Sequence, residues 1–265
     1  MICQLLIDPP AAGSWNMAVD EALLATAADE GIATLRLYQW NEPTLSLGYF
    51  QRYDDREQHS ASRHSAVVRR QTGGGAILHD RELTYSLALP SAHPLARQNR
   101  RLYTAVHQAF IELLQPSISE KNSRFELQLH CEASLLRPSA EPFLCFARRA
   151  KGDLLLVDRS RTNGPSLPDR AWKILGSAQR RHRGAILQHG GLLLEASSAA
   201  PDLPGVRDLT GVAIDVEQLT SALPSLIGDV LSASMHNTML SNEMRQRAAR
   251  IEQAKYGFSG WTKRR

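Results

Sequence analysis

Three consecutive glycines at positions 73–75 stand between charged side chains, a pattern that suits a ligand-binding loop. Glycine gives up side-chain packing and backbone entropy, so it is used where the chain takes positive φ or where another group approaches the backbone closely. Arg69 and Arg70 precede the glycines, and His79 and Asp80 follow them. A glycine-rich hairpin turn would explain the glycines equally well, but the polar flanks favour a bound ligand.

Cys145 is a candidate nucleophile, because basic residues follow it at 148, 149 and 151 and cations favour the reactive thiolate. A cysteine inside an apolar run such as 143–146 is more often inert packing. The neighbouring cations shift the balance toward a nucleophile. Cys131 follows His130, but neighbours on a strand point to opposite faces, so this pair is not expected to act together.

The glycine segment also carries a family resemblance. Residues 69–80, RRQTGGGAILHD, resemble the R-R-x-T/S-G-G-G/R-A-V-x-H-D motif of the lipoate ligase, biotin ligase and octanoyltransferase superfamily. Residues 16–23, residues 35–51 and the K-I-L-G-S-A-Q run that begins at Lys173 are similar to segments of the same family. The position of Cys145 ahead of that run and the continuation 82–86 resemble the cysteine-dependent octanoyltransferases.

The resemblance implies a function and its site residues. The chain would move an octanoyl group from octanoyl acyl carrier protein, through a thioester on Cys145, to a lysine of a lipoyl-domain protein such as the glycine cleavage H protein. Lys173, which alone would be interpreted as a solvent-facing strand lysine, would bind the acyl carbonyl and lower the pKa of the nucleophile. Neither a cofactor nor a metal is expected. The implied substrate-binding residues are Arg70, Thr72, Gly73, Gly74, Gly75, Ala76, His79, Gly176, Ser177, Ala178, Gln188 and His189.

Other functions remain open at this point. In an ATP-dependent lipoate-protein ligase, ATP and magnesium would be required, Lys173 and the glycine loop would hold an acyl adenylate, and Cys145 would be idle. An amidotransferase that moves octanoyl between lipoyl domains would also use a cysteine. A catalytically silent acyl-binding or nucleic-acid-binding module is a further alternative, against which Cys145 and Lys173 together argue.

Composition indicates a globular protein. Its 265 residues are 43% hydrophobic, and no stretch reaches the roughly 20 apolar residues of a membrane helix. The beginning of the sequence lacks a basic leader, and the three cysteines have no disulfide or zinc spacing, so a reducing cytoplasm is expected. The net charge is +4. Basic clusters at 148–151 and 180–183 are either solvated faces or a landing surface for an acidic partner, and nucleic acid is not expected.

The expected fold class is α+β, with one domain over 1–265 that has its core at about 30–220 and a C-terminal helix at 241–255. By resemblance this is the biotin/lipoate ligase catalytic fold, a mixed, mainly antiparallel sheet flanked by helices. Ser14 is expected to cap a helix that reaches Gly31, and the glycines are expected to join two strands. Periodicity predicts further helices at 99–114 and 216–223, followed in the first case by a loop at 116–124. Further strands are expected at 3–7, 34–40, 44–50, 125–129, 143–146, 153–157, 172–177, 185–188 and 192–194, and an inserted loop at 158–170.

Overall fold

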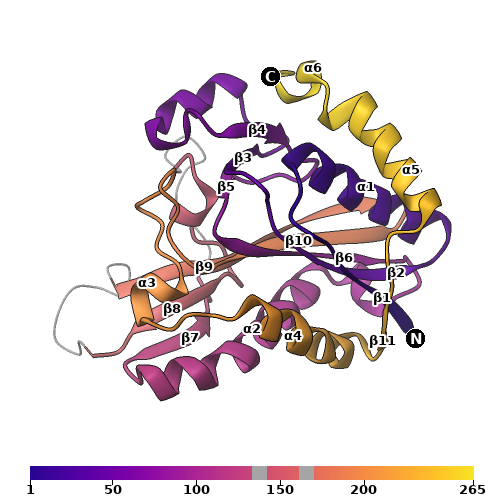
Figure 1. The fold of residues 1–265 in the computed structure, drawn as a ribbon. Helices are drawn as coiled ribbons and strands as arrows, with labels where there is room; N and C mark the ends of the chain where they lie inside the picture. Colours follow the sequence, from indigo (N-terminus) through magenta and orange to yellow (C-terminus); the bar gives the residue numbers. More distant parts are fainter. Residues whose placement is uncertain (133–141, 161–169) are drawn as a thin grey trace.

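The computed structural model describes residues 1–132, 142–160 and 170–265 (Figure 1). The inserted loop expected at 158–170 falls largely outside these residues. The strands are β1 Ile2–Ile7, β2 Ala33–Tyr38, β3 Thr44–Leu47, β4 Ala66–Arg69, β5 Ile77–His79, β6 Glu82–Leu89, β7 Phe125–Leu129, β8 Leu154–Asp158, β9 Ala171–His182, β10 Ala185–Leu193 and β11 Ser234–Asn237. The α-helices are α1 Gly13–Asp29, α2 Asn99–Lys121, α3 Val206–Thr210, α4 Val216–Leu231, α5 Asn242–Ile251 and α6 Ser259–Thr262. Short 3₁₀ helices are η1 Tyr53–Gln58, η2 Ser60–Ser62, η3 Pro94–Arg97 and η5 Cys145–Ala147, and a π-helical turn, Glu252–Tyr256, follows α5.

The described strands form two sheets. The larger has eight strands in the order β11-β1-β2-β6-β10-β9-β8-β7, and the smaller has three in the order β4-β3-β5. In the larger sheet, β1 pairs in parallel with β11 and β2, whereas every other pairing is antiparallel. The predicted α+β class with a mixed, mainly antiparallel sheet is therefore confirmed.

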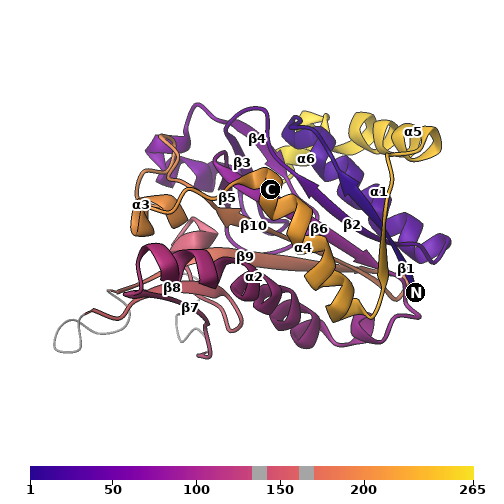
Figure 2. The same cartoon turned by 60° about the horizontal axis from the view of Figure 1, so that its bottom comes forward.

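Helices cover both faces of the larger sheet (Figures 1 and 2). Helix α1, with α5 packed on it, lies on one face, and α2 and α4 lie on the other. Side chains of strand β10 alternate between the two faces of the sheet. Leu187 packs in the core beneath α1, while Ile186 and Leu192 pack in the core beneath α2 and α4. This alternation follows from the two-residue period of a strand.

The strands on either side of the glycines do not pair with each other. Strand β4 ends at Arg69 and β5 begins at Ile77, but both pair with β3, which lies between them. The strand expected after the glycines is also divided. Its first part is β5 of the smaller sheet, whereas the part that follows is β6 of the larger sheet. The expected strand–turn–strand hairpin is therefore wrong. The glycines instead belong to a loop that crosses over the end of β3, close to Gly48.

Four other expected boundaries are wrong for physical reasons. Helix α2 continues through Pro116 to Lys121, because Leu114 and Ile118 extend its buried face. Strand β9 runs on past Ser177, and β10 is not interrupted at its two glycines, since β6 and β9 bond to it on both sides. Residues 145–147 form a 3₁₀ turn rather than part of a strand.

The start of α1 also differs from the prediction. The helix begins at Gly13, and Ala12 occupies the cap position without a side-chain hydrogen bond. The Ser14 hydroxyl instead donates to Glu252 Oε1 at 2.6 Å, which ties α1 to the segment after α5. A side-chain partner distant in sequence has replaced the expected local cap.

Candidate active site

Cys145 and Lys173 converge in the structure, although 28 positions separate them. The ammonium Nζ of Lys173 lies 3.6 Å from Cys145 Sγ and 3.3 Å from the Cys145 carbonyl oxygen. The Cys145 amide donates to the Ala76 carbonyl at 2.7 Å, and the Ala76 amide donates to the Phe143 carbonyl. The glycine loop therefore fixes the cysteine segment opposite the lysine.

A bulge in β9 directs Lys173 toward the cysteine. Leu155 of β8 pairs with Lys173, but the adjacent Leu154 pairs with Leu175, so β9 holds one extra residue, Ile174. A bulge of this kind changes which face a side chain points to. It allows Lys173 to extend over Gly176, where an added Cβ would lie only 2.3 Å from Lys173 Cε and 2.7 Å from Nζ.

A buried carboxylate completes the contacts of the lysine. Asp153 Oδ2 lies 2.9 Å from Lys173 Nζ, and both side chains are buried. Burial alone would lower the pKa of the Lys173 ammonium, but the negative charges of Cys145 and Asp153 outweigh it and raise that pKa. The site therefore keeps a cation beside the sulfur, as a nucleophilic thiolate requires.

Arg70 holds the glycine loop in place. Its guanidinium is fully buried and donates to the carbonyls of Gly73 and Gly75 at 2.8 and 2.7 Å, and also to Thr72 and Ser46. Burial lowers the pKa of Arg70 to about 10. The guanidinium already donates hydrogen bonds to these neutral groups. Arg70 therefore fixes the shape of the loop that was predicted to bind substrate.

The backbone of the glycine loop has N–H groups at Gly74 and Gly75 that bind no other described residue. Gly74 has φ +98°, a conformation that side chains other than glycine rarely adopt. In the described part of the chain, the amides of Gly74 and Gly75 have no hydrogen-bond partner, whereas the Ala76 amide is occupied. The two amides are therefore the candidates for holding a developing oxyanion.

The two predicted histidines lie in buried hydrogen-bonded chains beneath the loop. His79 bonds Ser46 Oγ at 2.8 Å and Glu82 Oε1 at 2.7 Å. His189 bonds Thr72 Oγ1 at 2.8 Å and Asp20 Oδ2 at 2.9 Å. These contacts are consistent with a role in building the pocket.

Ser177 and Gln188 point to the opposite face of the sheet. The Ser177 hydroxyl bonds His107 Nε2 at 2.7 Å and the Tyr85 hydroxyl at 2.6 Å, and Gln188 donates to the same tyrosine at 2.7 Å. The Ser177 amide donates to the Tyr103 hydroxyl. The side chains of these two residues therefore do not line the same face as Lys173, although Ser177 bonds to Tyr103 and His107.

A small cavity lies next to Gly176, between the two sheets. Its walls include Met17, Tyr38, Ile77 and Ala178 together with the bare backbone of Gly190 and Gly191. Its volume of about 20 Å³ has room for roughly one water molecule. An eight-carbon acyl chain would therefore enter only if side chains in the wall moved, and Met17 is the most adaptable of them.

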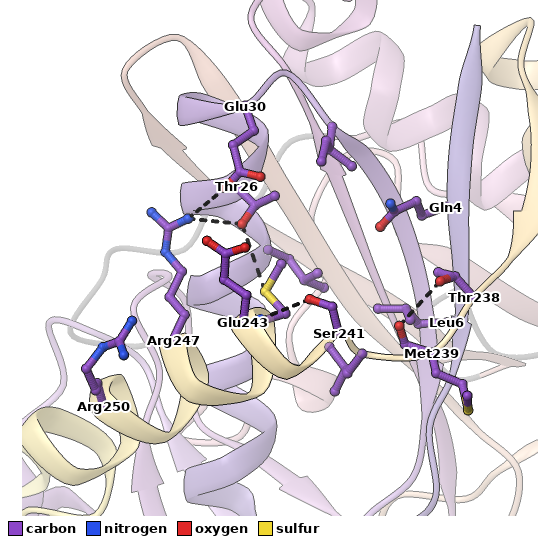
Figure 3. A pocket seen from close by; sticks show the side chains of 14 residues that line it. Gln4, Leu6, Thr26, Glu30, Thr238, Met239, Ser241, Glu243, Arg247 and Arg250 are labelled. Atoms are coloured by element: carbon purple, nitrogen blue, oxygen red, sulfur yellow. Dashed lines mark hydrogen bonds and ion pairs between the residues drawn. The ribbon is translucent and has the colours of Figure 1, made fainter.

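A larger cavity, of about 420 Å³, lies elsewhere (Figure 3). It is a groove between β1, α1 and α5, and Arg247 crosses it to contact Thr26 and Glu30. Within the described part of the chain, its lining includes no cysteine, histidine or lysine. The groove therefore lacks the nucleophile and cation that Cys145 and Lys173 bring together.

Sequence reasoning missed three residues of the site. Asp153, which holds Lys173, was interpreted only as the start of a strand. Tyr103 donates to Asp153 Oδ1 at 2.6 Å, and His107, which was interpreted as an ordinary helix residue, donates to the Gly152 carbonyl. Burial lowers the pKa of His107 to about 4, so its imidazole is neutral near pH 7. A charged residue directly before the apolar run 154–157 was the available signal for Asp153.

The arrangement suits covalent acyl transfer. A thiol beside an ammonium can form the thiolate that attacks a carbonyl carbon. The chemistry needs a reactive acyl donor and an acceptor nucleophile, and both must reach the sulfur.

Comparisons with known proteins point to one family. A family model described as the lipoyl protein ligase A/B catalytic domain matches residues 12–203, which contain the glycine loop, Cys145 and Lys173. The octanoyltransferase LipM of Kyrpidia tusciae is 31% identical to this chain. The alignment covers 99% of this chain and 98% of that relative. The octanoyltransferase LipM of Geobacillus kaustophilus is 36% identical over 71% of this chain, which spans only 62% of that relative.

Solved structures share the fold. A lipoate-protein ligase A bound with ATP superposes with a TM-score of 0.71 at 19% identity, over 99% of each chain. A bipartite lipoate protein ligase from Thermoplasma acidophilum, solved with its E2 lipoyl domain, gives 0.70 at 18% identity, over 99% of this chain and 96% of that one. At such identities the likeness establishes the architecture.

Proposed function

The chain belongs to the lipoyl protein ligase A/B catalytic-domain family, and from that premise we propose that it is an octanoyltransferase of lipoate biosynthesis that works through a thioester on Cys145. The family was predicted from the sequence, and the comparisons confirm it. The observation that carries the proposal is the 3.6 Å contact between Lys173 Nζ and Cys145 Sγ.

In the first half of the reaction, the Cys145 thiolate attacks the carbonyl carbon of octanoyl acyl carrier protein. A new C–S bond forms, the bond to the carrier's sulfur breaks, and the carrier leaves as a thiol after taking up a proton. Lys173 stabilises the thiolate, and the amides of Gly74 and Gly75, which have no hydrogen-bond partner among the described residues, receive the negative charge on the carbonyl oxygen.

In the second half, a lysine amine of a lipoyl-domain protein, such as the glycine cleavage H protein, attacks the Cys145 thioester. An amide forms, the C–S bond breaks, and the cysteine is regenerated. A thioester is already activated for this transfer, so the proposal requires no ATP, metal or other cofactor. The exposed cluster at the end of β9, Arg180, Arg181 and Arg183, offers a surface for an acidic protein partner.

The alternative is an ATP-dependent lipoate-protein ligase, in which Lys173 would contact an acyl adenylate. This reading is supported by the shared fold with a ligase bound with ATP. It gives no role to the sulfur of Cys145, which lies in contact with the lysine. The two functions differ in their substrates and can be separated directly.

The test is the mass of the protein after incubation with octanoyl acyl carrier protein, without ATP. We expect one added octanoyl group that hydroxylamine removes, as it does from thioesters, and no adduct on Cys145→Ser. Cys131→Ser is the matched control, because Cys131 is exposed and is not among the side chains that contact Lys173, and it should label normally. Labelling of Cys145→Ser equal to that of the wild type, or acyl transfer only with ATP, magnesium and free acid, would overturn the proposal.

A further inference from the structure

Lys173 has an acceptor for each of its three ammonium protons. Its Nζ lies 2.9 Å from Asp153 Oδ2, 3.3 Å from the Cys145 carbonyl and 3.6 Å from Cys145 Sγ. A neutral amine has two protons and a lone pair, and the lone pair would have to face one of these acceptors. The contacts therefore fit the protonated form.

Formation of the acyl-enzyme changes this balance. While Cys145 is a thiolate, its negative charge helps to keep Lys173 protonated. The thioester carries no charge, so that support disappears, and a buried ammonium without a counter-ion tends to lose its proton. Asp153 is the carboxylate within ion-pair distance of Lys173 among the described residues, and acylation of Cys145 does not alter it chemically.

A deprotonated Lys173 would be a competing nucleophile. The physiological acceptor in the proposed reaction is itself a lysine amine, and Lys173 Nζ is already 3.6 Å from the sulfur that carries the acyl group. Reacting groups held at about 3–3.5 Å behave as if present at an effective concentration of about 10⁵ M or more. The free acceptor could not compete with such a neighbour.

We propose that Asp153 keeps Lys173 protonated in the acyl-enzyme and so prevents the enzyme from transferring the octanoyl group to its own lysine. The inference rests on the proposed function. In the reaction that is prevented, Nζ would attack the thioester carbon, a C–N bond would form and the C–S bond would break. The proton released by the amine would pass to the Cys145 sulfur, leaving an amide on Lys173 and a free thiol.

The carboxylate of Asp153 accepts two hydrogen bonds besides its contact with Lys173. Its Oδ1 accepts the Tyr103 hydroxyl at 2.6 Å, its Oδ2 accepts the Ala150 amide at 2.6 Å, and the side chain is buried. Other ionisable groups packed nearby do not replace its charge. Tyr103 and His107 of α2 are neutral near pH 7, and Arg148, next to Gly75, is a cation.

The experiment compares wild type with Asp153→Asn, which keeps the shape of the side chain but removes its charge. Each protein is incubated with octanoyl acyl carrier protein, treated with hydroxylamine and mapped by peptide mass spectrometry. We expect Asp153→Asn to accumulate a hydroxylamine-resistant octanoyl group on Lys173, at least ten times as much as wild type. Asp153→Glu, which keeps the charge, and Asp158→Asn, the same change at the far end of β8, should show no such excess.

The outcomes separate the two proposals. If wild type forms no hydroxylamine-labile adduct, the proposed function fails. If wild type forms the labile adduct but Asp153→Asn leaves Lys173 unmodified, only the present inference is overturned. A merely structural role for Asp153 would lower labelling of Cys145 without moving the octanoyl group to Lys173.

A second measurement covers the case in which Asp153→Asn does not fold. In Cys145→Ser no thiolate is present, so Asp153 is left as the carboxylate beside Lys173. The pH titration of the Lys173 Nζ resonance, assigned by its loss in Lys173→Arg, should show a midpoint no lower than that of an ordinary lysine. A midpoint more than two pH units below it would overturn the inference.

Discussion

A single methyl group at Gly176 should remove most of the activity without unfolding the protein. In Gly176→Ala the new Cβ would lie 2.3 Å from Lys173 Cε and 2.7 Å from Nζ. Carbon atoms pack at about 3.5–4.0 Å, so the end of the lysine must move by more than about 1 Å. A misplacement of this size in a catalytic group costs about 100-fold in rate, or about 2.7 kcal/mol of transition-state stabilisation.

The fold should tolerate the change, because Gly176 does not have positive φ and the atoms that its Cβ meets belong to the flexible end of Lys173. The measurement is kcat/KM for octanoyl transfer, with the thermal midpoint as the control for folding. Gly73→Ala is a matched substitution. Among the described residues its methyl meets only Phe50, at 3.8 Å, so it should lose far less activity. A folded Gly176→Ala protein with kcat/KM within twofold of wild type would show that the position of Lys173 is not critical.

Two further predictions concern stability. Asp20→Asn should lower the free energy of unfolding, measured in urea, by about 3–5 kcal/mol, since it breaks the buried contact with Arg36 at 3.1 Å. Asp29→Asn, at the exposed end of the same helix, should cost far less. A similar cost for both would argue against the buried network. Burial lowers the pKa of His107 to about 4 in the folded protein. The unfolded chain therefore binds more protons than the folded protein between about pH 6.5 and 4. As the pH falls through that window, the free energy of unfolding of wild type should fall by about 3 kcal/mol relative to that of His107→Gln. If the difference in unfolding free energy between the two proteins, measured in urea, is the same at pH 7 and at pH 4, this assignment is contradicted.

Much of the fold was predictable because it follows from local patterns. The strand at β7 and the helices that begin at 99 and 216 have regular apolar spacing, and their periods identified them. The division of the glycine hairpin was not predictable in this way. Strand β3 inserts between β4 and β5 through long-range pairing, which the residues at 69–79 do not encode locally.

The candidate site could be proposed where a motif covers it. The resemblance predicted roles for Cys145 and Lys173, and the structure brings these two residues into contact. It did not reveal Asp153, whose role depends on the β9 bulge that turns Lys173 toward it. The contacts of His107 could not be predicted either. Its position in the sequence is that of an ordinary residue on the buried face of a helix.

The central claim is that the acyl group passes through Cys145, and a chase experiment tests it most directly. The octanoylated protein is isolated from its donor and mixed with a lipoyl-domain protein in a rapid-quench apparatus. We predict that the octanoyl group leaves Cys145 and appears on the acceptor's lysine at a rate at least equal to steady-state turnover. An isolated adduct that stays on Cys145, while the same protein turns over normally with octanoyl acyl carrier protein, would contradict the account.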